Sequence, residues 1–136
     1  MFSPQELSAL YLSAKVAGFA TLFCLPFAVA LAWVLARYEF RLKFIVEALL
    51  QLPMVLPPTV LGFYLLLLLG PHGPVGQLLA ALHWQALPFS FAGIVLGGVL
   101  HSLPFAIQPI QNSFEAMGAR PLEVAATLRA SPLDRF

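Results

Sequence analysis

Apolar residues fill long stretches of this chain, and the charged residues lie between those stretches. The clearest stretch is Val16–Ala36, a run of 21 residues without a charge, between Lys15 and Arg37. At a rise of 1.5 Å per residue, such a run can cross a hydrocarbon core of about 30 Å as an α-helix. The pattern therefore predicts a first transmembrane helix over about residues 10–36.

A second uncharged run, Ala48–Pro71, is interrupted early by prolines. These are Pro53, Pro57 and Pro58. Proline removes a backbone donor and disfavours helix at the residue before it, so the regular helix is expected to begin at the last pair and to continue over Thr59–Leu69. That helix alone is only about 16 Å long. The preceding residues must complete a second span, about 48–70, as a kinked or irregular entry that faces protein or a watery cavity.

A third uncharged run, Phe89–Phe114, predicts a span over about residues 89–112. Its glycines leave one helix face bare, which favours close helix packing in lipid; they are Gly93, Gly97 and Gly98. The preceding segment, Gly70–Leu87, carries no acid and no base other than two histidines. It is expected to be an external turn followed by a short amphipathic piece around Trp84.

The basic residues set the expected orientation of these spans. Three of them lie between the first and second spans and three follow the third: Arg37, Arg41, Lys43, Arg120, Arg129 and Arg135. By the positive-inside rule, the first loop and the C-terminal segment lie in the cytoplasm and the N-terminus lies outside. Lys15, near the outer end of the first span, is the one contrary charge.

Composition agrees with a multi-pass membrane protein and narrows its chemistry. With 60% hydrophobic residues, 10% charged residues and a mean hydropathy of +0.89, the chain has too little polar surface for a soluble globule. A net charge of +1 spread over short loops argues against a nucleic-acid partner. The single cysteine, Cys24, has no partner for an intrachain disulfide and is expected to be a small core or lipid-facing residue.

Two stretches resemble a known family. Gln51–Gln77, which reads QLPMVLPPTVLGFYLLLLLGPHGPVGQ, resembles the corresponding part of molybdate ABC transporter permease subunits. The later stretch LEVAATLRASPLDRF is similar to the EAA loop of ABC importer permeases, through which the membrane subunit touches its ATPase. The resemblance implies an all-α integral membrane protein: three transmembrane helices of the type I ABC importer permease fold, followed by a cytoplasmic EAA segment over residues 115–136. Residues 1–136 would then be the N-terminal part of one permease transmembrane domain, ending within the EAA loop.

Matching the EAA motif residue by residue assigns a coupling role to one short segment. The resemblance carries that role to Glu123, Ala125, Leu128, Ala130 and Ser131. Pro121 is expected at the first position of a short helix, and Ser131 is expected to cap a second helix with Asp134 at its third position. Arg129 stands where the family has a glycine in the turn between the two helices. A left-handed conformation there would cost a non-glycine residue about 1–2 kcal/mol. A plain amphipathic cytoplasmic tail is the alternative reading of the segment.

Polar side chains within the spans are candidates to line a route for an oxyanion, because neutral donors bind a divalent anion and let it leave again. The candidates are Gln51, Thr59, His101, Ser102 and Gln108, with Gln111 and Asn112 below them. Hydrogen bonding between helices is the competing role for each. Glu47 is interpreted as an interfacial residue.

The same sequence gives little support to catalysis or to cofactor binding. His72 and His83 have no nearby carboxylate in sequence, which argues against a metal site. A phosphate-binding GxxxxGK motif is missing, so ATP hydrolysis is expected on a separate subunit, and neither a cofactor nor an enzymatic activity is expected of this chain.

The resemblance implies a multi-pass permease of the cytoplasmic (inner) membrane that translocates molybdate. It would work as a homodimer with an ABC ATP-binding subunit and a periplasmic or external oxyanion-binding protein. Tungstate and sulfate are alternative substrates, since these anions share size and charge. A truncated permease fragment without function is an alternative of another class.

Overall fold

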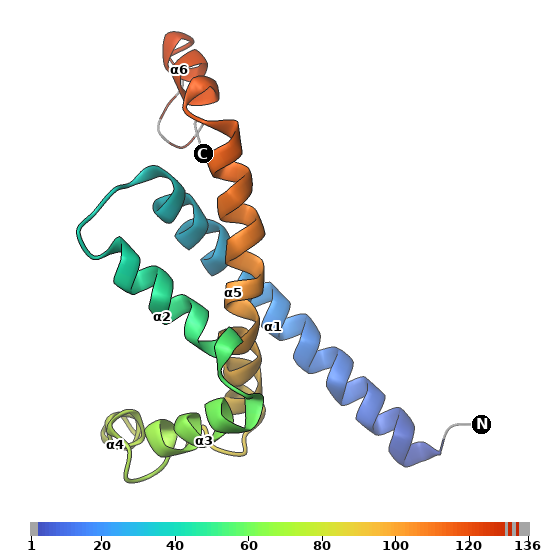
Figure 1. Ribbon diagram of the computed structural model, residues 1–136. Helices are drawn as coiled ribbons and strands as arrows, with labels where there is room; N and C mark the ends of the chain where they lie inside the picture. The colour runs from blue at the N-terminus through green and yellow to red at the C-terminus, as the bar shows by residue number, and fades with distance from the viewer. Residues whose placement is uncertain (1–2, 130, 132, 134–136) are drawn as a thin grey trace.

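The computed structural model describes residues 3–129, 131 and 133, and these residues form helices and connecting loops. The helices are α1 (Pro4–Arg37), α2 (Lys43–Val55), α3 (Pro58–Leu69), α4 (Pro74–Ala81), α5 (Phe91–Met117) and α6 (Arg120–Thr127). Long α1 and α5 cross each other, α2 and α3 form an arm on one side, and α6 projects from the far end of α5 (Figure 1). This arrangement confirms the all-helical class expected from the sequence.

Helix α1 is longer than its uncharged run, because its start is fixed by a polar cap. The Ser3 hydroxyl accepts a hydrogen bond from the Glu6 backbone N–H, and the Glu6 carboxylate accepts one from the Ser3 N–H at 2.6 Å. This reciprocal capping box begins the helix at Pro4, six residues before the expected start near residue 10. At 34 residues, α1 is about 51 Å long. Its N-terminal part extends away from the other helices (Figure 1).

A seam of small residues joins α1 to α5. The buried positions of α1 recur at every fourth residue and then after three: Ala20, Cys24, Ala28, Ala32 and Leu35. Residues four apart lie on one helix face, and small ones let two backbones approach closely. A β-carbon placed on Gly98 of α5 would lie 3.5 Å from the Ala20 β-carbon, which confirms the close packing predicted for that glycine. Cys24, only 4% exposed, is the small core residue that was expected.

Helices α1 and α5 run in the same direction. The Lys15 ammonium lies 5.2 Å from the centroid of the Phe91 ring at the start of α5. At the opposite end, Arg37 closes α1 and donates to the carbonyl of Gly118, which closes α5. The first contact also accounts for the contrary charge of Lys15, because an aromatic face stabilises a cation there.

The arm between these two helices is kinked, as expected for the second span, but the segment before the kink is more regular than expected. Its entry is not irregular: α2 is a regular helix that begins at Lys43 and contains Pro53. The break falls at Leu56 and Pro57, both extended, with ψ values of 135° and 140°. Consecutive prolines produce it, since each disfavours helix at the residue before it. Helix α3 then begins at Pro58 as expected, turned by 115° from α2.

The connection from α3 to α5 contains a short helix that was placed too late in the sequence-based prediction. Gly73 caps α4 and Pro74 occupies its first position, so the helix lies before Trp84 rather than around it. His83, with a φ of 56°, follows its end. The expected turn at Gly70–Gly73 is present.

The described helices have the length and the apolar surface of membrane-spanning helices. Helices α1 and α5 are each long and apolar enough to cross a membrane, and the bent pair α2–α3 adds a third crossing if it counts as one span. Large apolar side chains are widely exposed, among them Phe44 at 80% and Phe89 at 91%. Exposing this much apolar surface to water would be strongly unfavourable, so the chain is that of an integral membrane protein.

Candidate functional site

A polar cavity of about 270 Å³ lies where α2 meets the seam of α1 and α5. Its polar lining comes from one face of α2 and one face of α5: Glu47, Gln51, Gln108, Gln111 and Asn112. The spacings of four on α2 and of three and four on α5 place these side chains on single helix faces. Leu35, Leu50, Pro104 and Ile107 supply the apolar wall.

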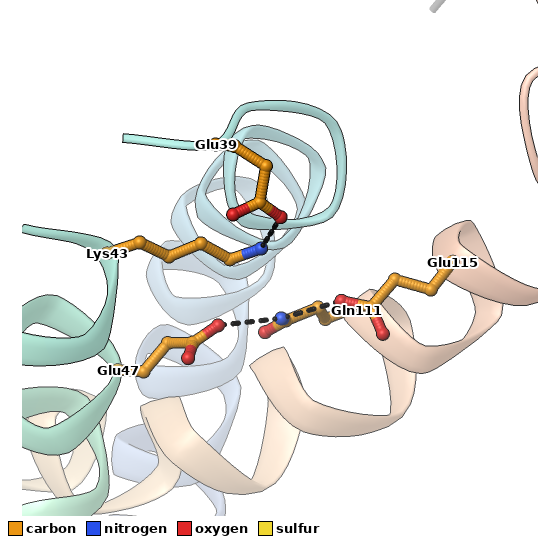
Figure 2. A network of polar contacts seen from close by, with 5 residues as sticks. All are labelled: Glu39, Lys43, Glu47, Gln111 and Glu115. Atoms are coloured by element: carbon orange, nitrogen blue, oxygen red, sulfur yellow. Dashed lines mark hydrogen bonds and ion pairs between the residues drawn. The ribbon is translucent and has the colours of Figure 1, made fainter. Parts of the chain in front are cut away.

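One amide bridges two carboxylates at an end of this cavity (Figure 2). The Gln111 Nε2 donates to Glu47 Oε1 at 3.1 Å and to Glu115 Oε1 at 2.9 Å. Beside this bridge, Lys43 Nζ lies 2.8 Å from Glu39 Oε1 in an exposed i, i+4 ion pair. Three carboxylates thus gather near one ammonium. The Gln111 bridge ties α2 to α5 beside the cavity.

The same bridge decides which cavity groups remain open to a ligand. Both N–H donors of Gln111 are engaged by carboxylates. The Gln108 amide has only a contact of 3.9 Å with the Met54 sulfur, a weak acceptor. The amides of Gln51, Gln108 and Asn112 are therefore the neutral donors in this lining, whereas the Glu47 carboxylate in the same lining would repel an anion.

The remaining residues predicted for the route do not join this cavity. Thr59 lines a second, apolar cavity of about 590 Å³ between α3 and α5. His101 is half-buried, its ring centroid lies 5.8 Å from that of Phe105, and its Nδ1 is buried without a hydrogen-bond partner in the described part of the chain. Ser102 is exposed. The structure thus brings Gln51 and Gln108 together and leaves the other three apart.

Glu47 is the cavity residue that sequence reasoning missed, because it was interpreted as interfacial. Its spacing of four from Gln51 was the available signal. No cluster of histidine, cysteine and acidic side chains fit for a metal ion occurs among the residues that the structure describes.

The predicted coupling segment forms a small projecting helix, α6. The helix begins at Arg120, one residue earlier than expected, so Pro121 occupies its second position and not its first. Glu123 in the first turn and Leu128 at the C-terminal end are exposed, Leu128 to 76%. Ala125 is half-buried, and Ser131 is exposed. Ala130 and most of the predicted second helix, with Pro132 and Asp134, lie outside the described residues.

The turn after α6 has the left-handed conformation suspected from the sequence. Arg129 has a φ of 56°, and its N–H donates to the Ala126 carbonyl at 3.1 Å. A residue with a β-carbon pays about 1–2 kcal/mol in this region of φ and ψ. Arginine therefore weakens a turn that glycine would form without strain.

The sequence is similar to permease proteins of molybdenum and sulfate transport systems. No family model matches the sequence. The molybdenum transport system permease protein ModB of Azotobacter vinelandii is 54% identical over 98% of this chain and 59% of its own length. The protein of the same name from Escherichia coli (strain K12) is 37% identical over 96% of this chain and 57% of its own length. The sulfate transport system permease protein CysT of Salmonella typhimurium is 32% identical, over 98% of this chain and 48% of its own length. The chain thus spans between about half and three fifths of these relatives.

Proposed function

We propose, on the premise that this chain is a relative of the permease proteins of molybdenum transport systems, that it is part of the membrane subunit of a molybdate importer. The observation that carries this proposal is the 54% identity over 98% of the chain to one such permease. A sulfate permease is only 32% identical over the same share of the chain. This difference favours molybdate over sulfate as the transported oxyanion.

The importer is of the ABC type, in which a separate subunit hydrolyses ATP and this chain performs no chemistry on the substrate. A second copy of the permease completes the pathway, and an external oxyanion-binding protein delivers the anion. The resemblance of the α6 segment to an EAA loop supports the ATPase partner. The exposure of Glu123 and Leu128 supports it further, because a contact helix must present side chains to its groove.

In the membrane the chain makes three crossings, with the N-terminus outside and α6 in the cytoplasm. Two observations support this topology. Helices α1 and α5 run in the same direction, so the chain must return across the membrane between them, and α2–α3 is the segment available. Arg37 and Arg120 lie at the α6 end of the molecule, which the positive-inside rule places in the cytoplasm.

The polar cavity is the part of the translocation route that this chain contributes. Gln51, Gln108 and Asn112 offer neutral donors to an oxyanion. In the described conformation Gln111 of α5 donates to Glu47 of α2, and both residues line this cavity. Passage of an anion between α2 and α5 would require this contact to open.

Transport by a full-length permease that carries this sequence tests the proposal. The permease is reconstituted in proteoliposomes with its ATPase subunit and its binding protein, and uptake of labelled molybdate, tungstate and sulfate is measured with and without ATP. ATP-dependent molybdate uptake in excess of sulfate uptake is expected. Preferential sulfate or tungstate uptake would assign the chain to the alternative substrate. Absence of uptake of all three anions would support the non-functional reading.

The coupling role of α6 is tested in the same vesicles. Replacing Leu128→Ala removes an exposed apolar side chain that is expected to be buried in the ATPase groove, so association should weaken by roughly tenfold or more. Met117→Ala, at the exposed end of α5, is the matched control and should leave association with the ATPase subunit unchanged. Equal effects of the two replacements would mean that α6 is only a tail.

Topology is tested by thiol labelling of intact cells. A cysteine at His72 should react with a membrane-impermeant reagent and one at Glu39 should not, in a background without Cys24. Both positions are exposed in the structure, so the membrane alone decides access. The opposite labelling pattern would overturn the orientation.

A further inference from the structure

The joint between α5 and α6 depends on a backbone conformation that glycine alone adopts easily. Gly118 ends α5 with a φ of 64° and a ψ of −163°. This region of φ and ψ is essentially restricted to glycine. A β-carbon at Gly118 would meet nothing within 4 Å, so conformation rather than space requires the glycine here. The direction in which α6 leaves α5 is therefore set by this peptide.

The carbonyl of that joint is held by a residue 81 positions earlier in the chain. Arg37, the last residue of α1, donates from Nη1 to the Gly118 oxygen at 2.5 Å. A guanidinium donor makes this a charge-assisted hydrogen bond, which is stronger than one between neutral groups. The C-terminal end of α1 is thus bonded directly to the joint between α5 and α6.

The contact lies beside a cavity and leaves one donor of Arg37 unsatisfied. A cavity of about 570 Å³ lies between the C-terminal ends of α1 and α5 and the start of α6, lined in part by Trp33, Phe114 and Leu122. The Arg37 Nε is buried without a hydrogen-bond partner among the described residues. An unsatisfied buried donor costs stability, and such groups in native proteins call for a functional explanation.

We propose that Arg37 is a positioning residue for coupling: its bond to the Gly118 carbonyl fixes the angle of α6 and transmits movement of α6 to α1. This inference rests on the proposed function, in which α6 is the contact with the ATPase. When the ATPase displaces α6, the force reaches α1 through the guanidinium as well as through the chain of α5. The α1–α5 seam then moves as one body.

A distance measurement and a coupling measurement on the same variants test this role. In the full-length permease with Cys24→Ala, spin labels are placed at Phe105 on α5 and Val124 on α6, which are 51% and 59% exposed. Arg37→Gln should broaden the distribution of distances between the labels and lower stimulated ATP hydrolysis by roughly tenfold. Arg37→Lys retains a charged donor and should largely restore both. Arg41→Gln removes one exposed positive charge from the same loop and should change neither.

The two measurements separate failure of this inference from failure of the proposed function. An unchanged distance distribution in Arg37→Gln would show that the bond from Arg37 to the Gly118 carbonyl does not fix the angle of α6. A broadened distribution with unchanged stimulated ATP hydrolysis would show that fixing this angle is not needed for coupling. If the unsubstituted permease shows no stimulated ATP hydrolysis, the proposed function fails. The distance distribution still decides whether Arg37 fixes the angle of α6. Should Arg37→Gln not reach the membrane, the distance distribution of the Cys24→Ala permease that retains Arg37 is the test: a narrow distribution is expected if Arg37 holds the Gly118 carbonyl, and a broad one would overturn the proposal.

Discussion

Helix α5 meets its two neighbours in opposite ways. Toward α1 it presents glycine to a row of small residues, and Ala28 and Ala32 on that row are 0% exposed. Toward α2 it presents amides across a cavity, and α2 contains no buried residue. In lipid, where helices gain little by hiding apolar surface from one another, close packing decides which contacts are strong. Only the half-buried Val46 and Leu50 of α2 pack against the buried cluster of α1 and α5. The contrast indicates a closely packed scaffold of α1 and α5 and a more loosely packed arm of α2 and α3.

The arm has a further property that the scaffold lacks. Its break at Leu56 and Pro57 separates α2 from α3, so α2 can move without carrying α3 as a rigid extension. Prolines also occur inside the scaffold helices, namely Pro26 in α1 and Pro104 and Pro109 in α5, yet the helices continue through them. Single prolines are absorbed within a packed helix, whereas the consecutive pair in the arm is not.

The largest expected effect comes from breaking the scaffold. Ala28→Leu inserts a bulky side chain at a fully buried position and should lower the free energy of unfolding by about 1–3 kcal/mol. Ala30→Leu, on the exposed face of the same helix, is the matched control and should change little. Thermal unfolding of the purified permease in detergent measures both. Similar losses at the two positions would mean that the seam is not closely packed.

A smaller loss is expected from the bridge between arm and scaffold. Gln111→Met removes the donor shared by Glu47 and Glu115 and should cost about 1–2 kcal/mol, because two carboxylates then face each other without it. Gln108→Met, on the same cavity, loses only a weak contact with sulfur and should cost less. The same unfolding assay compares them. A larger effect at Gln108 would contradict the assignment of the bridge.

The smallest expected change is a gain, and it lies in the arm. Gly62 is within α3, and a β-carbon there would meet nothing within 4 Å. Gly62→Ala should therefore stabilise the helix by about 0.5–1 kcal/mol. At Gly98 the new methyl group would lie 3.5 Å from the Ala20 β-carbon, in ordinary van der Waals contact, so Gly98→Ala should gain at least as much. A loss of stability in Gly98→Ala would mean that the seam is packed more tightly than this distance indicates.

The sequence predicted the parts of this fold that depend on local physics. The uncharged runs located the residues of α1 and α5, and the proline pair located the start of α3 at Pro58. It could not show that α2 is a regular helix, because Pro53 is disfavoured in a helix by local energy and is tolerated here by its surroundings. The early start of α1 was readable in the capping box of Ser3 and Glu6, which lies outside the uncharged run.

The candidate site was less accessible from sequence, because it depends on which helix faces meet. Gln51 and Gln108 share a cavity, yet nothing local distinguishes them from Thr59 or His101, which face elsewhere. The left-handed turn at Arg129 was foreseen because a family motif carried the backbone requirement. The contact of Arg37 with Gly118 was not, since it joins residues 81 positions apart.

The shared direction of α1 and α5 has an electrostatic consequence at the Arg37 end. Antiparallel neighbours cancel their helix dipoles, whereas parallel neighbours add them, and each helix C-terminus carries about half a negative elementary charge. The two C-termini that meet near Gly118 therefore present roughly one negative charge from backbone carbonyls alone. Arg37 lies there with one positive charge. Formal residue charge thus overstates how positive this end of the molecule is, since the parallel backbones neutralise one of its arginines.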